Sequence, residues 1–196
     1  METITVPTPA RTSLDEIVLA GRTILEADGI DGLTMQRVAA TVGVRPPSLY
    51  KRVEGRTHLV RLIANDVVGE LAETMDAAAT SGDPRHDLRR LAHAFRAFAQ
   101  ANPNGYSLIF GQLDEAERAD PELNARASAA LLRTAAALAG PDYGLDAART
   151  VVAWANGFVS MELSGAFRLG GDVDRAFAYG IDRLSSSISD GAPLPR

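Results

Sequence analysis

The sequence predicts an all-α protein with a small three-helix domain at its N-terminal end and a larger, six-helix domain behind it. Apolar residues recur at helical spacing along most of the 196 residues, and no stretch alternates with a period of two for long enough to indicate a strand. Residues 37–61 contain six basic residues and one acidic residue, although the whole chain carries a net charge of -5. A compact basic island in an acidic chain is typical of a module that meets phosphate.

The first helix is predicted from its capping residues. Residues 1–12 contain two prolines and several threonines, and we expect them to form a flexible arm. Ser13 lies three residues before Glu16, which is the spacing of a capping box and marks a helix start. The apolar pattern that follows ends near Gly29, a residue type that commonly terminates helices.

Two shorter helices complete the predicted N-terminal domain, residues 13–55. Thr34 is the expected N-cap of the second helix, and Gly43 ends it. Prolines 46 and 47 open a very short third helix, because proline is tolerated in a first helical turn. A short helix, a glycine-bearing turn and a second helix have the spacing of a helix-turn-helix. A longer helix begins at Arg56 and fades over residues 77–83.

The second predicted domain, residues 56–190, is helical throughout. After the helix that begins at residue 56, apolar periodicity together with Asp-Pro and Gly-Pro boundaries predicts five more helices. They cover residues 83–100, 106–113, 120–138, 142–167 and 172–187, with a turn at 102–105.

Composition excludes several classes of chemistry. The chain has no cysteine, so it has no disulfide, thiolate zinc site or cysteine nucleophile. His86 and His93 are seven residues apart on one predicted helix, about 10 Å at 1.5 Å per residue, which is too far for one metal ion. No phosphate loop, dinucleotide fingerprint or nucleophile elbow is present. We therefore expect no enzyme activity, no cofactor and no metal.

Targeting signals are also missing from the sequence. No apolar run approaches the ~20 residues of a membrane helix. The N-terminus has no basic segment followed by an apolar run, so no secretory signal is expected. We predict a cytoplasmic protein without a membrane partner.

The segment 33–60 resembles the DNA-binding module of the TetR family of bacterial repressors, and the resemblance covers about residues 13–65. The matching positions are Thr34, Val38, Ala39, Gly43, Val44, Ser48, Leu49, Tyr50, Val53, Arg56 and Leu59. The resemblance implies a helix-turn-helix that binds a double-stranded DNA operator, followed by a helical domain that dimerises and binds a small effector.

The expected DNA contacts are polar or basic residues of this module. They are Thr34, Arg45, Pro47, Ser48, Tyr50, Lys51, Arg52 and Arg56. Thr34, at a helix N-terminus, and the Tyr50 hydroxyl suit phosphate contacts, and Arg56 adds a charge where the family usually has lysine. Arg45, Pro47, Ser48, Lys51 and Arg52 occupy the positions nearest the bases. The alternative is that Tyr50 belongs to the core and the arginines form a solvated face.

Residues 154–167 resemble a TetR subfamily marked by Trp followed by His-Gly, but Asn156 stands in the histidine position and cannot titrate. For an apolar effector cavity of at least ~300 Å³, the candidates are aromatic, amide and carboxylate residues of the second domain. They are Phe95, Phe98, Tyr106, Phe110, Trp154, Asn156, Phe158, Met161 and Glu162. Glu162 is expected either to face the effector, to pair with an arginine (across the dimer, for example) or to face water. Pairing with an arginine would favour a neutral effector.

The last two helices carry more apolar positions than one buried face can use, which predicts a homodimer. The expected interface residues are Val159, Leu163, Phe177, Ile181, Leu184 and Ile188. Gly180 is expected to allow close approach there. The predicted function is a homodimeric transcriptional regulator, a repressor that a mostly hydrophobic effector releases from a palindromic operator. The alternative is a helical ligand-binding or oligomerisation protein with vestigial DNA binding.

Overall fold

The computed structural model describes residues 12–189, and this part of the chain is helical with no strand. Its elements, in order, are α1 (Leu14–Gly32), α2 (Met35–Thr41), α3 (Pro46–Leu49), α4 (Arg56–Ala78), α5 (Pro84–Ala101), α6 (Pro103–Phe110), the 3-10 turn η1 (Glu115–Glu117), α7 (Pro121–Ala139), α8 (Gly144–Leu163) and α9 (Val173–Ser189). The predicted all-α class is therefore confirmed. Residues 1–11 of the predicted arm (1–12) and residues 190–196 lie outside the described residues.

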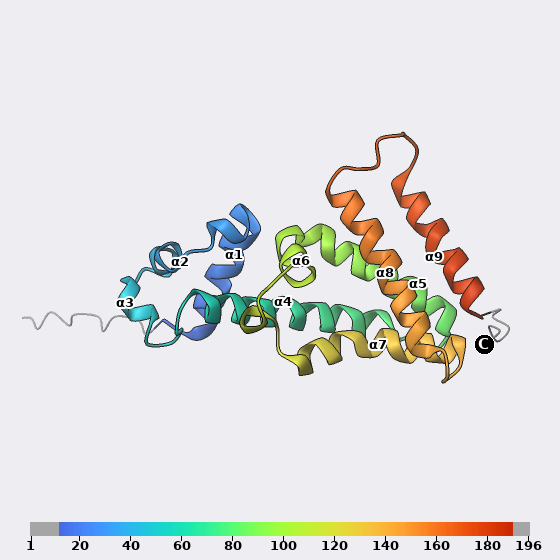
Figure 1. Cartoon of the computed structure of the whole chain (residues 1–196), viewed down its shortest axis with the longest axis horizontal. Coiled ribbons are helices and arrows are strands. Elements are labelled where there is room, and N and C mark those ends of the chain that lie inside the picture. Colours follow the sequence, from blue (N-terminus) through green and yellow to red (C-terminus); the bar gives the residue numbers. More distant parts are fainter. Residues whose placement is uncertain (1–11, 190–196) are drawn as a thin grey trace, which may run out of the picture.

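The long helix α4 joins two parts of the molecule (Figure 1). Helices α1 to α3 lie at its N-terminal end and form the head, residues 12–55. Helices α5, α6 and α7 pack along the rest of α4, and α8 and α9 pack on α5 and α7. Together with α4 these helices form the body, residues 56–189. Helices α8 and α9 form a hairpin at the end of the molecule farthest from α2 and α3.

Local capping signals determine where several helices begin. The Ser13 hydroxyl accepts a hydrogen bond from the Glu16 amide, and the Glu16 carboxylate accepts one from the Ser13 amide. Thr34 caps α2 by accepting from the Arg37 amide, and Asp83 caps α5 in the same way. These side chains satisfy amide groups that have no partner inside their helix.

Helices α6 and α8 have boundaries that differ from the prediction. Helix α6 begins at Pro103 instead of residue 106, and a carboxylate from α1 binds its first free amides, as described below. It ends at Phe110 instead of residue 113. Helix α8 ends at Leu163 instead of continuing to 167. Gly165 adopts a left-handed conformation (φ 66°), and the amides of residues 165 and 166 donate back to Glu162 and Met161. This is a Schellman motif, which needs a residue that tolerates positive φ.

None of the helices between residues 12 and 189 combines the length and the apolar character that crossing a membrane requires. One continuous core runs through head and body. In the head it contains Leu33, Val38, Leu49 and Val53, and α4 extends it into the body.

Candidate functional site

The residues of the head fall into two sets, one buried and one exposed. Val38 and Ala39 of α2, Leu49 of α3 and Val53 are buried and hold the two short helices against α1 and α4. Gly43, between α2 and α3, has a φ of 72°, which permits the tight turn of the helix-turn-helix. All eight predicted DNA contacts, Thr34, Arg45, Pro47, Ser48, Tyr50, Lys51, Arg52 and Arg56, are exposed.

The position of Tyr50 tests one part of the alternative interpretation, in which it belongs to the core. Its side chain is 54% exposed, so it is not a core residue. The side chains of Arg45, Lys51 and Arg52 form no hydrogen bond or ion pair with any residue between 12 and 189. Three exposed cations without an acceptor in the described part of the chain therefore flank α3, Arg45 before it and Lys51 and Arg52 after it.

The other basic residues of the island have partners inside the chain. Arg37 pairs with Asp28, and Arg61 pairs with Asp120. The Arg61 guanidinium and the Asn65 amide both donate to Asp120, and these hydrogen bonds lower the pKa of its carboxyl group. Because Arg37 and Arg61 are paired with carboxylates, less positive charge is available for binding an anion than the net charge of the basic island indicates.

Arg56 lies at the boundary between head and body. Its guanidinium donates to the carbonyl oxygens of Ile30 (3.0 Å) and Leu33 (3.2 Å), and it lies 3.7 Å from the Glu117 carboxylate of η1. The side chain is still 45% exposed. The contact of Arg56 with a DNA phosphate stays a prediction. A phosphate bound there would interact with the same guanidinium group as the Glu117 carboxylate.

A polar joint attaches α1 to the body. Arg22, which is 9% exposed, donates to Asp66 (3.1 Å) and Glu70 (2.8 Å) of α4 and to the Asn102 amide oxygen (2.9 Å). One turn further along α1, the Glu26 carboxylate accepts from the backbone amides of residues 104 (3.1 Å) and 105 (2.8 Å). The N-terminal end of α6 is thereby held by a carboxylate of the head.

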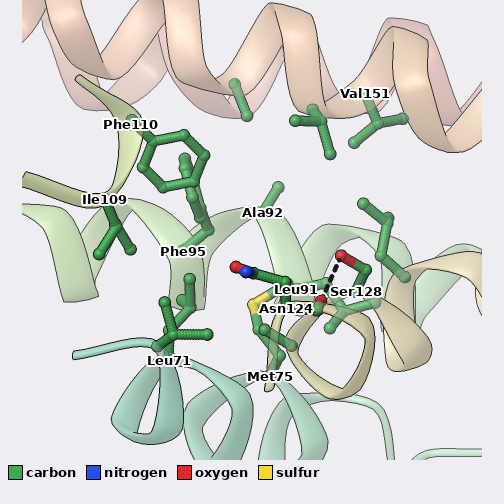
Figure 2. A pocket seen from close by; sticks show the side chains of 15 residues that line it. Leu71, Met75, Leu91, Ala92, Phe95, Ile109, Phe110, Asn124, Ser128 and Val151 are labelled. Atoms are coloured by element: carbon green, nitrogen blue, oxygen red, sulfur yellow. Dashed lines mark hydrogen bonds between the residues drawn. The ribbon is translucent and has the colours of Figure 1, made fainter. Parts of the chain in front are cut away.

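The body contains a cavity of about 170 Å³ between five helices (Figure 2). Its walls are Val68, Leu71 and Met75 from α4; Leu91, Ala92 and Phe95 from α5; Ile109 and Phe110 from α6; Asn124, Ala127, Ser128 and Leu131 from α7; and Val151, Val152 and Ala155 from α8. The cavity touches α8 as expected, but it is smaller than the ~300 Å³ expected for an effector site.

Of the nine effector residues predicted from the sequence, Phe95 and Phe110 line this cavity. The rings of these two residues meet edge to face, with centroids 5.5 Å apart. The other seven, Phe98, Tyr106, Trp154, Asn156, Phe158, Met161 and Glu162, do not line it. Several of these seven side chains contact other side chains of the body, as described below.

Trp154 and Phe158 lie on the face of α8 that α9 covers. Their ring centroids lie 4.9 and 5.1 Å from that of Phe177 of α9, so the three rings fill the space between the two helices. Gly180 permits this approach, because a Cβ there would lie 2.3 Å from the Trp154 ring. The close approach predicted at Gly180 is thus made inside the chain.

Asn156 and Glu162 are engaged by other side chains. The Tyr106 hydroxyl donates to the Asn156 amide oxygen (2.6 Å), and burial raises the pKa of Tyr106. Glu162 accepts two hydrogen bonds from Arg96 (2.7 and 2.5 Å) and one from Gln100 (3.0 Å). The bonds from Arg96 hold the pKa of Glu162 below its usual range. Glu162 therefore pairs with an arginine of its own chain.

The wall formed by α7 was missed by sequence reasoning. Residues 124, 127, 128 and 131 recur at helical spacing, and three of them are small or short, namely Asn124, Ala127 and Ser128. Small side chains on one face of a helix leave volume when larger neighbours face them. That spacing is a usable signal for a pocket wall, whereas aromatic residues alone are a weaker one.

Three predicted interface residues belong to the core of the subunit. Val159, Phe177 and Ile181 have no exposed surface in the single chain, because the facing sides of α5, α8 and α9 enclose them. They cannot be direct contacts of a partner subunit. Leu163 is 38% exposed, Leu184 and Ile188 are half-buried, and Met161 and Tyr179 are exposed beside them.

Comparisons with known proteins agree with this architecture. Residues 88–184 match the family profile described as "Tetracyclin repressor-like, C-terminal domain". The uncharacterized HTH-type transcriptional regulator Rv0681 of Mycobacterium tuberculosis (strain ATCC 25618 / H37Rv) is 30% identical over 190 residues, 93% of this chain and 84% of the relative.

Solved structures share the fold over nearly the whole chain. The crystal structure of SCO4313, described as a regulatory protein, superposes with a TM-score of 0.76 and 28% identity over 91% of this chain and 98% of that chain. A TetR variant from Acinetobacter baumannii AYE, in complex with minocycline, superposes with a TM-score of 0.69 at 21% identity, over 91% of this chain and 97% of that chain.

An exposed helix-turn-helix attached to a helical body, together with these relatives, indicates the class of DNA-binding transcriptional regulators. The chain belongs to the TetR family of these regulators, whose members bind DNA, act as dimers and bind small molecules. The likeness of residues 154–167 to the Trp-His-Gly subfamily stays a prediction.

Proposed function

We propose that this chain is a homodimeric repressor that binds a near-palindromic operator and leaves it when a small, mostly apolar molecule occupies the body cavity. Three free cations on the head, Arg45, Lys51 and Arg52, support the DNA contact. The internal pairing of Glu162 with Arg96 supports a neutral effector, because no charge of that pair is left to bind an ion.

The observation that carries the proposal is that two helices of the body, α4 and α6, both line the cavity and contact the head. Helix α4 contributes Val68, Leu71 and Met75 to the cavity, and its first residue, Arg56, donates to two carbonyl groups of the head. A ligand that pushes α4 aside therefore also moves the support of the helix-turn-helix.

Helix α6 supplies the second connection. Ile109 and Phe110 at its C-terminal end line the cavity, and the amides at its N-terminal end bind Glu26 of α1. The helix has only eight residues, so its two ends move together. Displacement of Phe110 by a ligand is then transmitted to α1 through a hydrogen-bonded contact.

The coupling between the two sites is reciprocal. If the ligand prefers the arrangement in which α4 and α6 are displaced, it lowers DNA affinity by the same factor by which DNA lowers ligand affinity. A dimer supplies two heads, and near-palindromic half-sites about 34–36 Å apart, or a near multiple of that distance, fit one head each. We expect α8 and α9 to form the dimer contact through their outer faces, which carry Leu163, Leu184, Ile188 and Tyr179.

Selection of DNA from a random pool by the full-length protein tests the proposal. We expect enrichment of one inverted repeat, with binding that weakens steeply as salt rises, because phosphate contacts release counterions. Arg45→Ala should weaken binding by about 10-fold or more and relax base preference in each half-site, as expected for a base contact.

The matched control is Arg133→Ala, which removes the same charge from an exposed position on α7 of the body. It should leave operator affinity unchanged. Failure to enrich any sequence, with only weak binding to all duplexes, would favour the alternative of a helical ligand-binding protein with vestigial DNA binding.

A further inference from the structure

We infer that the cavity takes a neutral, single-ring molecule that carries one hydrogen-bond donor, and that the Oδ1 atom of Asn124 accepts this hydrogen bond. The inference rests on the proposed function, since it names the class of effector for the same cavity. Its evidence is the chemistry of the lining, the hydrogen bonds of its two polar side chains and its volume.

The lining contains no charged side chain. Thirteen of its fifteen residues are apolar, and the two others are Asn124 and Ser128. A carboxylate or an ammonium group would lose its hydration there without gaining an opposite charge, which costs several kcal/mol or more. The cavity therefore selects neutral molecules.

Asn124 and Ser128 already use their hydrogen-bond donors inside the chain, so towards a ligand they can act only as acceptors. The Asn124 Nδ2 donates to the carbonyl oxygens of Ala119 (3.1 Å) and Asp120 (3.3 Å), and these acceptors fix which end of the amide is nitrogen. The Ser128 hydroxyl donates its hydrogen to the Asn124 carbonyl oxygen (3.0 Å). The Asn124 Oδ1 has no donor among residues 12–189.

The Asn124 amide extends into the middle of the cavity, towards Phe95 (Figure 2). A ligand oxygen that offers only lone pairs would meet acceptors there and gain nothing. Asn124 is exposed, so a ligand hydroxyl or N–H group would instead replace water as the donor to Oδ1. The ligand must therefore bring the donor.

Size and shape limit the rest of the ligand. The cavity volume of about 170 Å³ is close to that of an engineered apolar cavity of ~150 Å³ that holds benzene. Phe95 and Phe110 present two rings at 90° to each other, and Met75 adds a polarisable sulfur on the opposite wall. A single planar ring packs against such walls by edge-to-face and sulfur–aromatic contacts.

Two probes of equal size distinguish the contribution of the hydrogen-bond donor from that of the aromatic ring. 4-Methylphenol and methoxybenzene have the same number of heavy atoms, and only the first can donate a hydrogen bond. At pH 7 the phenol is neutral, since its pKa is near 10. Calorimetry with the full-length protein in the absence of DNA should give one 4-methylphenol site per chain, and about 10-fold weaker binding of methoxybenzene, as expected for one unmade hydrogen bond. Benzoate should not bind.

Two variants test the assignment of the site. Asn124→Leu should bind both neutral probes with nearly equal affinity, because the acceptor is replaced by an apolar group of similar volume. Ala127→Leu should weaken both probes alike by filling the cavity. Far-UV circular dichroism checks that each variant is folded. If Asn124→Leu misfolds, Ser128→Ala, which keeps the Oδ1 acceptor, must retain the 10-fold preference.

The outcomes distinguish the inference from the proposed function. No binding of 4-methylphenol at millimolar concentration, equal binding of both probes by the wild-type chain, or preferred binding of benzoate would overturn the inference. Each of these leaves operator selection by the head untouched. Selective binding of 4-methylphenol without any loss of operator affinity would support the ligand class and contradict effector-driven release.

Discussion

The head and the body of this protein present their functional groups in opposite ways. In the head, the predicted DNA contacts project outward from two short helices and the turn after them, and a small buried set of residues only holds those helices in place. In the body, the candidate ligand site is partly open to solvent and is lined by residues of five helices that are up to 87 positions apart in the sequence, from Val68 to Ala155.

This difference predicts which substitutions the head and the body each tolerate. A surface contact of the head can be removed with little effect on folding, because water replaces it. In the body, binding and folding depend on the same residues, since the side chains around the cavity also pack the helices against one another. Aromatic residues of the body that were expected to bind ligand, such as Trp154, instead stabilise the α8–α9 hairpin.

The largest expected effect comes from removing the aromatic side chain that fills this hairpin. Phe177 is fully buried, contacts the rings of Trp154 and Phe158, and lies under the Arg96 guanidinium. Phe177→Ala should lower the free energy of unfolding by about 3–5 kcal/mol. Chemical denaturation followed by circular dichroism measures this change.

Tyr179 is the matched control on the same helix, because its ring is 63% exposed. Tyr179→Ala should change the unfolding free energy of the subunit much less, and should instead weaken dimerisation, which analytical ultracentrifugation measures. If both variants are equally destabilised, the division of α9 into a core face and a partner face is wrong.

A smaller effect is expected from the ion pair between α5 and α8. Glu162→Gln leaves the buried Arg96 with a weaker partner and should cost about 1–3 kcal/mol at pH 7. The folded-state pKa of Glu162 is lowered, so its stabilising contribution is present above the unfolded pKa of about 4.3 and is lost as pH falls through the folded-state value.

The difference in stability between wild type and Glu162→Gln should therefore be constant at neutral pH and shrink towards zero below about pH 4. Urea titrations at several pH values measure it. Glu73→Gln is the control, since Glu73 is exposed and its ion pair with Arg126 is long (3.9 Å). A difference that persists unchanged in acid would mean that the charge of Glu162 does not stabilise the body.

The smallest effect tests the boundary between the two parts. Arg56→Ala should weaken operator and non-specific DNA alike, by about 10-fold or less, and reduce the salt dependence of binding by about one ion. Fluorescence anisotropy at several salt concentrations measures both quantities. A loss of affinity with an unchanged salt slope would mean that Arg56 acts through the head carbonyls of Ile30 and Leu33 and not through phosphate.

Prediction from sequence succeeded where the deciding interactions are local. The caps at Ser13, Thr34 and Asp83 and the turn at Gly43 depend on residues within a few positions of each other, and the structure has them where they were expected. It failed at the start of α6, because the carboxylate that binds the first amides of that helix belongs to Glu26, 78 residues earlier.

The sequence by itself therefore determined the helical class, most helix boundaries and the helix-turn-helix with its exposed cations. Only the tertiary structure decided which face of α8 meets α9, that α7 forms a wall of the cavity, and that Glu162 pairs with Arg96. Helix α8 is apolar on more than one side, so its periodicity fits several rotations about its axis. Packing against α5, α7 and α9 selects one of them, and that selection depends on contacts between residues far apart in the chain.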